Sequence, residues 1–232
     1  MLIFLLKKNF INDDFFLNIY GDKILIQNEI KKYKIPSHLF KIIHTDSVVS
    51  DKETPLTAIK NSKNTSMWNC IKSQVDGDSN ISLSAGNTGV LLVISRMILK
   101  MMDEVSKPAL AGLWPNEKGM NVVLDLGANI ECSDKNLIDF SIMGSALFKS
   151  LYPMDNPEVA LLNIGSEELK GNEIIKKAYQ SLQNNRNKNF NFQGYVEGNQ
   201  IMDGKVNVIV TDGFTGNIAL KTADGTANFI MN

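Results

Sequence analysis

The residues best suited to chemistry lie in a short loop, Ser84–Gly89, with the sequence SAGNTG. It combines two glycines, an amide and two hydroxyls between a short apolar run and a helical pattern. A helix N-terminus offers free backbone N–H groups and the positive end of the helix dipole, so this loop could hold a phosphate-sized anion. The alternative is a strand-to-helix turn in which Asn87 or Thr88 only caps the helix. A short glycine-rich loop alone does not decide between the two.

Three further loops have the same character, and each follows an apolar run. Their sequences are DLGAN (125–129), NIGSE (163–167) and DGFTGN (212–217). In open parallel sheets, ligands bind in the crevice outside the carboxyl ends of the strands. Four such loops therefore favour a ligand site over four unrelated turns.

Residues that carry covalent chemistry are sparse. The two histidines, His38 and His44, do not suggest a catalytic triad and are interpreted as structural or exposed. Cys70 lies on an expected helix as a packed thiol, and Cys132 has no sequence neighbour that would lower its pKa. Two cysteines do not make a zinc site, and no Walker, GxGxxG or paired-carboxylate metal motif is present. A reaction on this scaffold would rely on positioning and hydrogen-bond donors.

Composition and charge narrow the class of protein further. The 232 residues carry a formal net charge of −1, so no basic field exists that would attract nucleic acid. No run approaches the ~18 apolar residues needed to span a bilayer. The opening MLIFLLKKNF places its charges after the apolar run, unlike a signal peptide. These features predict a cytoplasmic protein with reduced thiols.

The elements that must position these loops repeat one plan of apolar run, turn and helix. Strands are expected at about 15–20, before His44, before Ser84, before Asp125, and at 159–162, 192–196 and 206–210. Alternating strands and helices predict an α/β fold with a mostly parallel, doubly wound sheet. No segment is a convincing linker, so residues 1–232 are expected to form a single α/β domain.

Seven strings in one order carry a resemblance to a known family. They are SAGNTG (84–89), KPALAGLWP (107–115), LDLGAN (124–129), FSIMG (140–144), NIGSEELKGN (163–172), FQGYVEG (192–198) and DGFTGNIALKTADG (212–225); TPLTAIKNSKNTSM (54–67) also fits. The chain resembles the PlsX family, the phosphate acyltransferases of bacterial phospholipid synthesis, over about residues 15–230.

The resemblance implies the fold of phosphate acetyltransferases and of isocitrate and isopropylmalate dehydrogenases. It implies transfer of a long-chain acyl group from acyl carrier protein to inorganic phosphate, giving acyl phosphate for phospholipid synthesis. It also implies a homodimer, no organic cofactor, and peripheral contact with the membrane where glycerol-3-phosphate is acylated. A related dehydrogenase is disfavoured because no paired acidic metal motif is visible.

The same resemblance suggests roles for the residues of the loops. An amide such as Asn129 or Asn217 would stabilise the developing oxyanion, Lys221 would offset negative charge, and Asp212 would orient a donor or handle a proton. Phosphate would be held by Ser84, Ala85, Gly86, Asn87, Thr88, Gly89 and Lys170. For Asp212, Lys221 and Lys170 the alternative is a turn residue or a solvated charge.

The sequence departs from the family pattern in three places. It has no DAMGGD-like first strand and turn, and it ends within the helix after DGFTGN, so we expect a domain lacking the family's first strand and C-terminal part. Lys60 and Lys107 stand where the family usually has arginine, which keeps the charge but loses the planar fork. The alternatives to an active enzyme are a truncated, inactive fragment and a phosphate-binding module without turnover.

Overall fold

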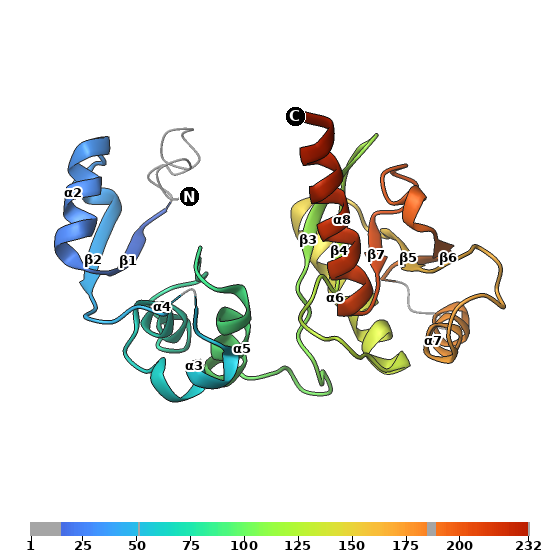
Figure 1. Ribbon diagram of the computed structural model, residues 1–232, viewed down its shortest axis with the longest axis horizontal. Coiled ribbons are helices and arrows are strands. Elements are labelled where there is room, and N and C mark those ends of the chain that lie inside the picture. Colours follow the sequence, from blue (N-terminus) through green and yellow to red (C-terminus); the bar gives the residue numbers. More distant parts are fainter. Residues whose placement is uncertain (1–14, 51, 185–188, 232) are drawn as a thin grey trace. The chain divides into compact units, whose positions relative to one another are not determined.

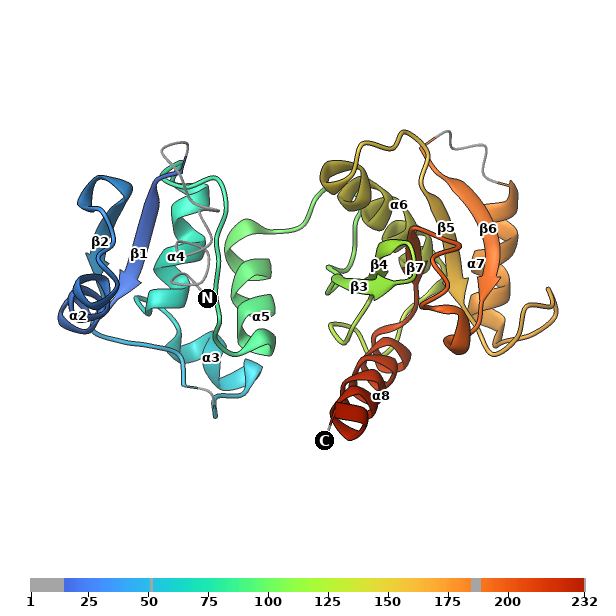
Figure 2. The same ribbon diagram turned by 90° about the horizontal axis from the view of Figure 1, so that it is seen from above.

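The computed structural model describes residues 15–50, 52–184 and 189–231. The opening segment MLIFLLKKNF, whose pattern is unlike that of a signal peptide, lies outside these residues. The chain folds as two compact units, Met1–Met101 and Met102–Asn232, whose elements are shown in Figures 1 and 2. Each unit is described by itself. That residues 1–232 act as one domain stays a prediction.

In its described residues, the first unit combines a small parallel sheet with four α-helices. Strands β1 and β2 pair in parallel register, with Leu17 opposite Phe40. Helix α2 begins at Lys23 because the Asp22 carboxylate accepts the backbone N–H groups of Ile24 and Leu25. The elements are β1 (Leu17–Gly21), α2 (Lys23–Tyr33), a 3-10 turn (Ser37–Leu39), β2 (Phe40–His44), α3 (Pro55–Asn61), α4 (Ser66–Val75) and α5 (Thr88–Leu99).

The core of this unit lies between α4 and α5. Met67 and Ile71 of α4 pack with Val90 and Ile94 of α5, and each pair is spaced four residues apart on one helix face. Thr65 caps α4 by accepting the Trp68 N–H at 3.3 Å. Two capped helices with matched apolar faces therefore fix the place where the Ser84–Gly89 loop joins α5.

The strand expected before Ser84 is wrong, because residues 80–84 adopt no regular structure. The backbone carbonyls of this segment accept hydrogen bonds from side chains of α4 instead of from a neighbouring strand. Gln74 Nε2 donates to the Asn80 carbonyl at 3.0 Å, and Cys70 Sγ lies 3.8 Å from the Leu83 carbonyl. Side-chain donors thus take the place of the β-sheet hydrogen bonds that the apolar pattern predicted for this segment.

The second unit contains a five-stranded sheet in the order β3-β4-β7-β5-β6. Strands β4, β7, β5 and β6 are parallel, and β3 runs antiparallel to β4 at the edge. The elements are β3 (Gly112–Asn116), β4 (Gly119–Leu124), α6 (Asp134–Leu151), β5 (Glu158–Leu162), α7 (Glu173–Asn184), β6 (Asn191–Val196), a 3-10 turn (Gly198–Gln200), β7 (Val208–Val210) and α8 (Gly213–Met231).

Helices cover both faces of this sheet, as Figure 2 shows. One core joins the sheet to α6 and α7 through residues such as Leu124, Phe140 and Leu182. The other joins the opposite face to α8, where Ala219, Leu220 and Ala223 pack against residues such as Ile209. A mostly parallel sheet with helices on both faces confirms the predicted fold class. Within the described ranges, no helix is both long and apolar enough to cross a bilayer.

Candidate functional site

The loop after β4 is organised by one buried carboxylate, that of Asp125, which is 0% exposed. Its Oδ1 accepts the backbone N–H groups of Leu110, Gly127 and Ala128 at 3.0, 3.1 and 2.9 Å. Its Oδ2 accepts the Asn129 N–H at 2.8 Å and Asn129 Nδ2 at 2.7 Å. A buried charge requires such hydrogen bonds, and five of them fix the conformation of residues 125–129.

The first turn of α8 packs directly against this loop through glycines. The Gly213 N–H donates to the Asn129 carbonyl at 2.8 Å, and a Cβ at Gly213 would lie 2.5 Å from that oxygen. A Cβ at Gly216 would overlap the Asp125 carbonyl oxygen. In return, Gly127, at φ +130°, leaves room for the side chain of Asn217, whose Nδ2 would lie 2.8 Å from a Cβ there. The motifs DLGAN and DGFTGN therefore interlock, because β4 and β7 are neighbouring strands.

The two asparagines that were expected to donate to an oxyanion differ in this arrangement. Asn129 Nδ2 donates to Pro108 O and to Asp125 Oδ2, both at 2.7 Å, which uses both of its N–H bonds. Asn217 Nδ2 makes one hydrogen bond, to Leu126 O at 3.3 Å. Its second N–H has no acceptor within the described part of the chain. The geometry thus favours Asn217 over Asn129 as the donor, and both roles stay predictions.

Asp212 and Lys221 lie before and along the same helix. The Asp212 carboxylate accepts the Thr215 N–H and the Thr215 hydroxyl, each at 2.8 Å, so it caps α8 and orients that hydroxyl. Lys221 is exposed one helical turn after Asn217, on the same face of α8. Asn129, Asp212 and Asn217 are therefore brought together, with Lys221 adjacent along α8.

Lys170 belongs to the loop between β5 and α7, at the same end of the sheet. This loop begins at Asn163, which is buried, and ends where Asn172 caps α7 by accepting the Ile175 N–H at 2.9 Å. Lys170 is exposed, and its backbone N–H donates to Glu167 O at 2.9 Å. Three of the four glycine-rich loops thus gather at the carboxyl ends of adjacent parallel strands, as predicted.

The Ser84–Gly89 loop belongs to the first unit, at the N-terminus of α5. Asn87 Oδ1 accepts the Val90 N–H at 3.1 Å, and the Ser84 hydroxyl accepts the Gly86 N–H at 3.2 Å. Asn87 therefore caps the helix, as the alternative interpretation supposed. The N–H groups of Thr88 and Gly89 have no acceptor among the described residues, so capping leaves two donors for an anion. Phosphate binding by residues 84–89 stays a prediction.

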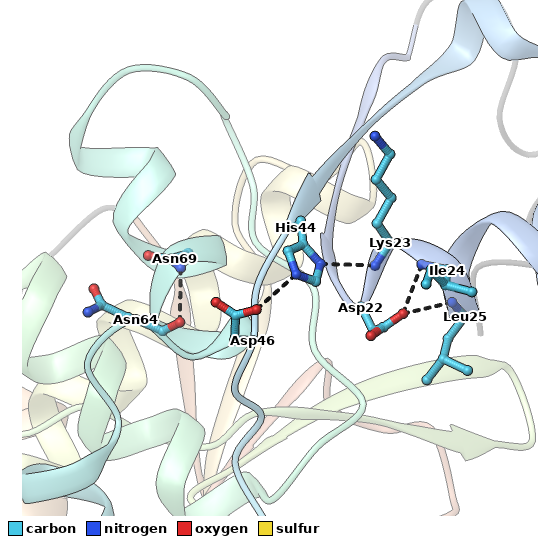
Figure 3. A network of polar contacts seen from close by, with 8 residues as sticks. All are labelled: Asp22, Lys23, Ile24, Leu25, His44, Asp46, Asn64 and Asn69. Atoms are coloured by element: carbon cyan, nitrogen blue, oxygen red, sulfur yellow. Dashed lines mark hydrogen bonds and ion pairs between the residues drawn. The ribbon is translucent and has the colours of Figure 1, made fainter.

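His44 has a structural role in the first unit, shown in Figure 3. Its Nδ1 accepts the Lys23 N–H at the start of α2, at 3.1 Å. Nδ1 is therefore unprotonated, and Nε2 carries the proton toward Asp46 Oδ1 at 2.9 Å. Beside it, Asp22 caps α2, and Asn69 Nδ2 donates to Asn64 O at 3.3 Å. The interpretation of His44 as a structural residue agrees with these contacts.

The thiol nearest the second-unit loops is poorly suited to nucleophilic attack. Burial raises the pKa of the Cys132 thiol; the Gly213 N–H and Lys107 lower it in part, while Asp125 and Asp212 raise it further. Lys107 donates to Glu131 O at 2.7 Å. In the described ranges, no cluster of three or more His, Cys, Asp or Glu residues is placed to hold a metal ion.

Two residues outside the predicted site prove central to its geometry: Asp125 and Asn163. Both were visible within the motifs DLGAN and NIGSE as the first polar residue after an apolar run. Their position directly after a buried strand could have identified them, because a polar residue there is itself buried and needs hydrogen-bond partners.

Two solved structures identify the class of fold to which this chain belongs. The structure is similar to the EutD phosphotransacetylase from Staphylococcus aureus, with a TM-score of 0.61, 16% identity, and coverage of 90% of this chain and 73% of that one. It is also similar to a branched-chain phosphotransacylase from Enterococcus faecalis V583, with a TM-score of 0.57, 14% identity, and coverage of 90% and 84%. These likenesses confirm a phosphate acetyltransferase-like fold.

The family follows from the sequence itself. Residues 7–232 match the sequence profile of the family described as fatty acid synthesis protein, and the chain belongs to that family. It is 63% identical over 221 residues to a phosphate acyltransferase of Pelagibacter ubique, covering 95% of this chain and 66% of that protein. It is 41% identical over 214 residues to a phosphate acyltransferase of Caulobacter vibrioides, covering 92% and 59%. The chain thus spans less than two thirds of the length of these curated relatives.

Proposed function

We propose that this chain transfers a long-chain acyl group from acyl carrier protein to inorganic phosphate, giving acyl phosphate for phospholipid synthesis. The family membership and the relatives named phosphate acyltransferase support this proposal. The observation that carries it is the interlock of the DLGAN and DGFTGN loops at the carboxyl ends of two neighbouring strands. This interlock holds an Asn217 N–H that has no acceptor among the described residues.

The reaction needs little from the protein besides positioning. A phosphate oxygen attacks the thioester carbonyl carbon, the new C–O bond forms, and the C–S bond breaks so that the carrier-protein thiolate leaves and takes up a proton. The free N–H groups at the start of α5, beside Asn87, would orient the phosphate. No cysteine nucleophile is required, which agrees with the raised pKa of the Cys132 thiol.

The site must above all stabilise the negative charge that develops on the thioester carbonyl oxygen in the transition state. Asn217 supplies the donor, because its amide is held by Leu126 O and still has an N–H to give. Lys221, one turn further along α8, offsets the charge of phosphate and the oxyanion. Asp212 accepts both the Thr215 N–H and the Thr215 hydroxyl, which fixes the first turn of the helix that carries Asn217. Its role is therefore to orient a donor rather than to handle a proton.

We further propose that the protein acts in the cytoplasm as a homodimer, with peripheral contact where its product is consumed at the membrane. A binding module without turnover is the second candidate. It is favoured by the anion-binding features of the α5 N-terminus, which do not depend on the second unit.

The deciding experiment mixes the purified chain with a long-chain acyl carrier protein thioester and phosphate, and traps acyl phosphate with hydroxylamine as the hydroxamate. We expect phosphate-dependent hydroxamate that is lost in Asn87→Ala. A soluble, cooperatively folded chain that forms none would contradict the proposal. Stabilisation by phosphate in that case would support the binding module, and its absence would support an inactive fragment.

A further inference from the structure

The loop between β5 and α7 is closed by a single buried side chain, that of Asn163. This residue is 7% exposed, and its backbone N–H donates to Val196 O on β6 at 2.9 Å. Its Nδ2 donates to Gly165 O at 3.1 Å and to Lys170 O at 3.2 Å. One amide anchored at a strand end therefore draws together the two ends of the segment 165–170.

The residue after Lys170 is shaped to admit this contact. Gly171 adopts φ +93°, a conformation that favours glycine, and a Cβ there would lie 2.5 Å from Asn163 Oδ1. Because any larger residue would push Asn163 away from Lys170 O, the Asn163 and Gly171 positions depend on each other. The string KGN thus combines a cation, a glycine that accommodates Asn163, and the residue that caps α7.

One atom of this arrangement carries a cost to folding, which points to a role beyond stability. Asn163 Oδ1 is buried and has no hydrogen-bond partner within the described ranges. A buried carbonyl without a partner loses its hydration without compensation, and an apolar side chain would avoid that loss. Groups that reduce stability are retained mainly where they serve function. Here the hydrogen bonds of Asn163 fix the backbone conformation at Lys170.

The backbone conformation at Lys170 matters because it sets the position of the Lys170 side chain. Its Cγ would lie 3.2 Å from a Cβ on Gly165, so its stem passes over the glycine whose carbonyl Asn163 holds. The Lys170 ammonium has no acidic partner in the described part of the chain, although Glu167 and Glu168 share the loop. An anion approaching Lys170 must avoid these two carboxylates, so small displacements of the ammonium change the net attraction strongly.

We propose that Asn163 is a positioning residue that fixes Lys170 for phosphate binding; the inference rests on the proposed function and on the phosphate-binding role that the family resemblance suggests for Lys170. Asn163 itself touches no substrate. It acts through the carbonyls of Gly165 and Lys170, and Gly171 provides the space that this requires.

The test is a double-mutant cycle read out as the phosphate dissociation constant, measured by titration calorimetry on the full chain. We expect Lys170→Ala to weaken phosphate binding by about tenfold or more, the effect of losing a hydrogen bond to a charged group. Asn163→Ala should weaken it in the same direction and by no more than Lys170→Ala does. The double variant should bind no more weakly than Lys170→Ala alone, because Asn163 acts only through Lys170. A loss of fold alone would not produce this non-additivity.

Asn172→Ala is the matched control, since it removes another asparagine of the same loop and weakens only the α7 cap. It should lower the melting temperature and leave the dissociation constant unchanged, whereas Asn163→Ala should weaken phosphate binding. Additive losses, or unchanged phosphate binding in Asn163→Ala, would overturn the inference, as would a wild-type chain that binds no phosphate. If the cycle behaves as expected and no acyl phosphate forms, acyl transfer fails while the role of Asn163 stands.

Discussion

The interlock between α8 and the DLGAN loop can be tested with two glycines of the same helix. In Gly216→Ala, the new methyl group would overlap the Asp125 carbonyl oxygen and lie 2.9 Å from Thr211 Cγ2. The obstacle is largely backbone, which cannot rotate away as a flexible side chain could. In Gly225→Ala, the methyl group would meet nothing within 4 Å. The two substitutions therefore share a helix and differ in what the added atom contacts.

The expected magnitudes have opposite signs. Replacing an exposed glycine within a helix by alanine stabilises it by about 0.5–1 kcal/mol, and Gly225→Ala should show this gain. Overpacking usually destabilises by about 1–3 kcal/mol and more against rigid neighbours, so Gly216→Ala should lose at least about 3 kcal/mol. The unfolding free energies of the two variants should thus differ by about 4 kcal/mol.

Urea denaturation of both variants beside the wild-type chain measures the difference directly, since the midpoint shifts with stability at constant slope. Acyl phosphate formation should fall with Gly216→Ala even at low temperature, where the chain remains folded, because α8 carries Asn217 and Lys221. Equal stability of the two variants would refute the close packing of α8 on the Asp125 carbonyl, and with it the interlocked site.

Two further predictions concern titrating groups. Burial raises the pKa of the Asp139 carboxyl, while Lys135 opposes this effect and Glu104 adds to it. The folded chain therefore binds this proton more tightly than the unfolded chain does. As a result, the free energy of unfolding falls as the pH rises above about 4 through the pKa of the folded chain. Asp139→Asn should therefore be more stable than wild type at neutral pH, with the difference shrinking toward pH 3.5, whereas a difference independent of pH would count against the assignment. Because burial raises the pKa of the Cys132 thiol, iodoacetamide followed by peptide mass spectrometry should find Cys70 labelled before Cys132, and the reverse order would contradict the packing of Cys132.

Much of the second unit could be predicted because its strands are continuous apolar runs ending in polar turns. β4, β5 and β7 fall within or directly before the predicted positions, and the loops after them meet at one edge of the sheet. β3 was not predicted, since Pro115 lies within it and a proline usually argues against a strand. The edge position explains the exception, because only one side of β3 pairs with the sheet.

The remaining features depend on contacts that no local pattern encodes. The strand expected before Ser84 is absent because side chains of α4 bond to its carbonyls. The room for Asn217 beside Gly127 joins residues about ninety positions apart. Similarly, the sequence treats Asn129 and Asn217 as equivalent amides, and only the contact with Pro108 O reveals that one has both N–H bonds engaged.

The most direct test of the central claim is the rate of phosphate-dependent acyl phosphate formation by Asn217→Ala relative to the wild-type chain, at matched folding. Loss of one preorganised oxyanion donor typically lowers kcat by about 10²–10³-fold, and we predict a loss of that size with little change in the melting temperature. A folded Asn217→Ala variant that retains the wild-type rate would contradict the assignment of Asn217 as the donor at the interlocked loops.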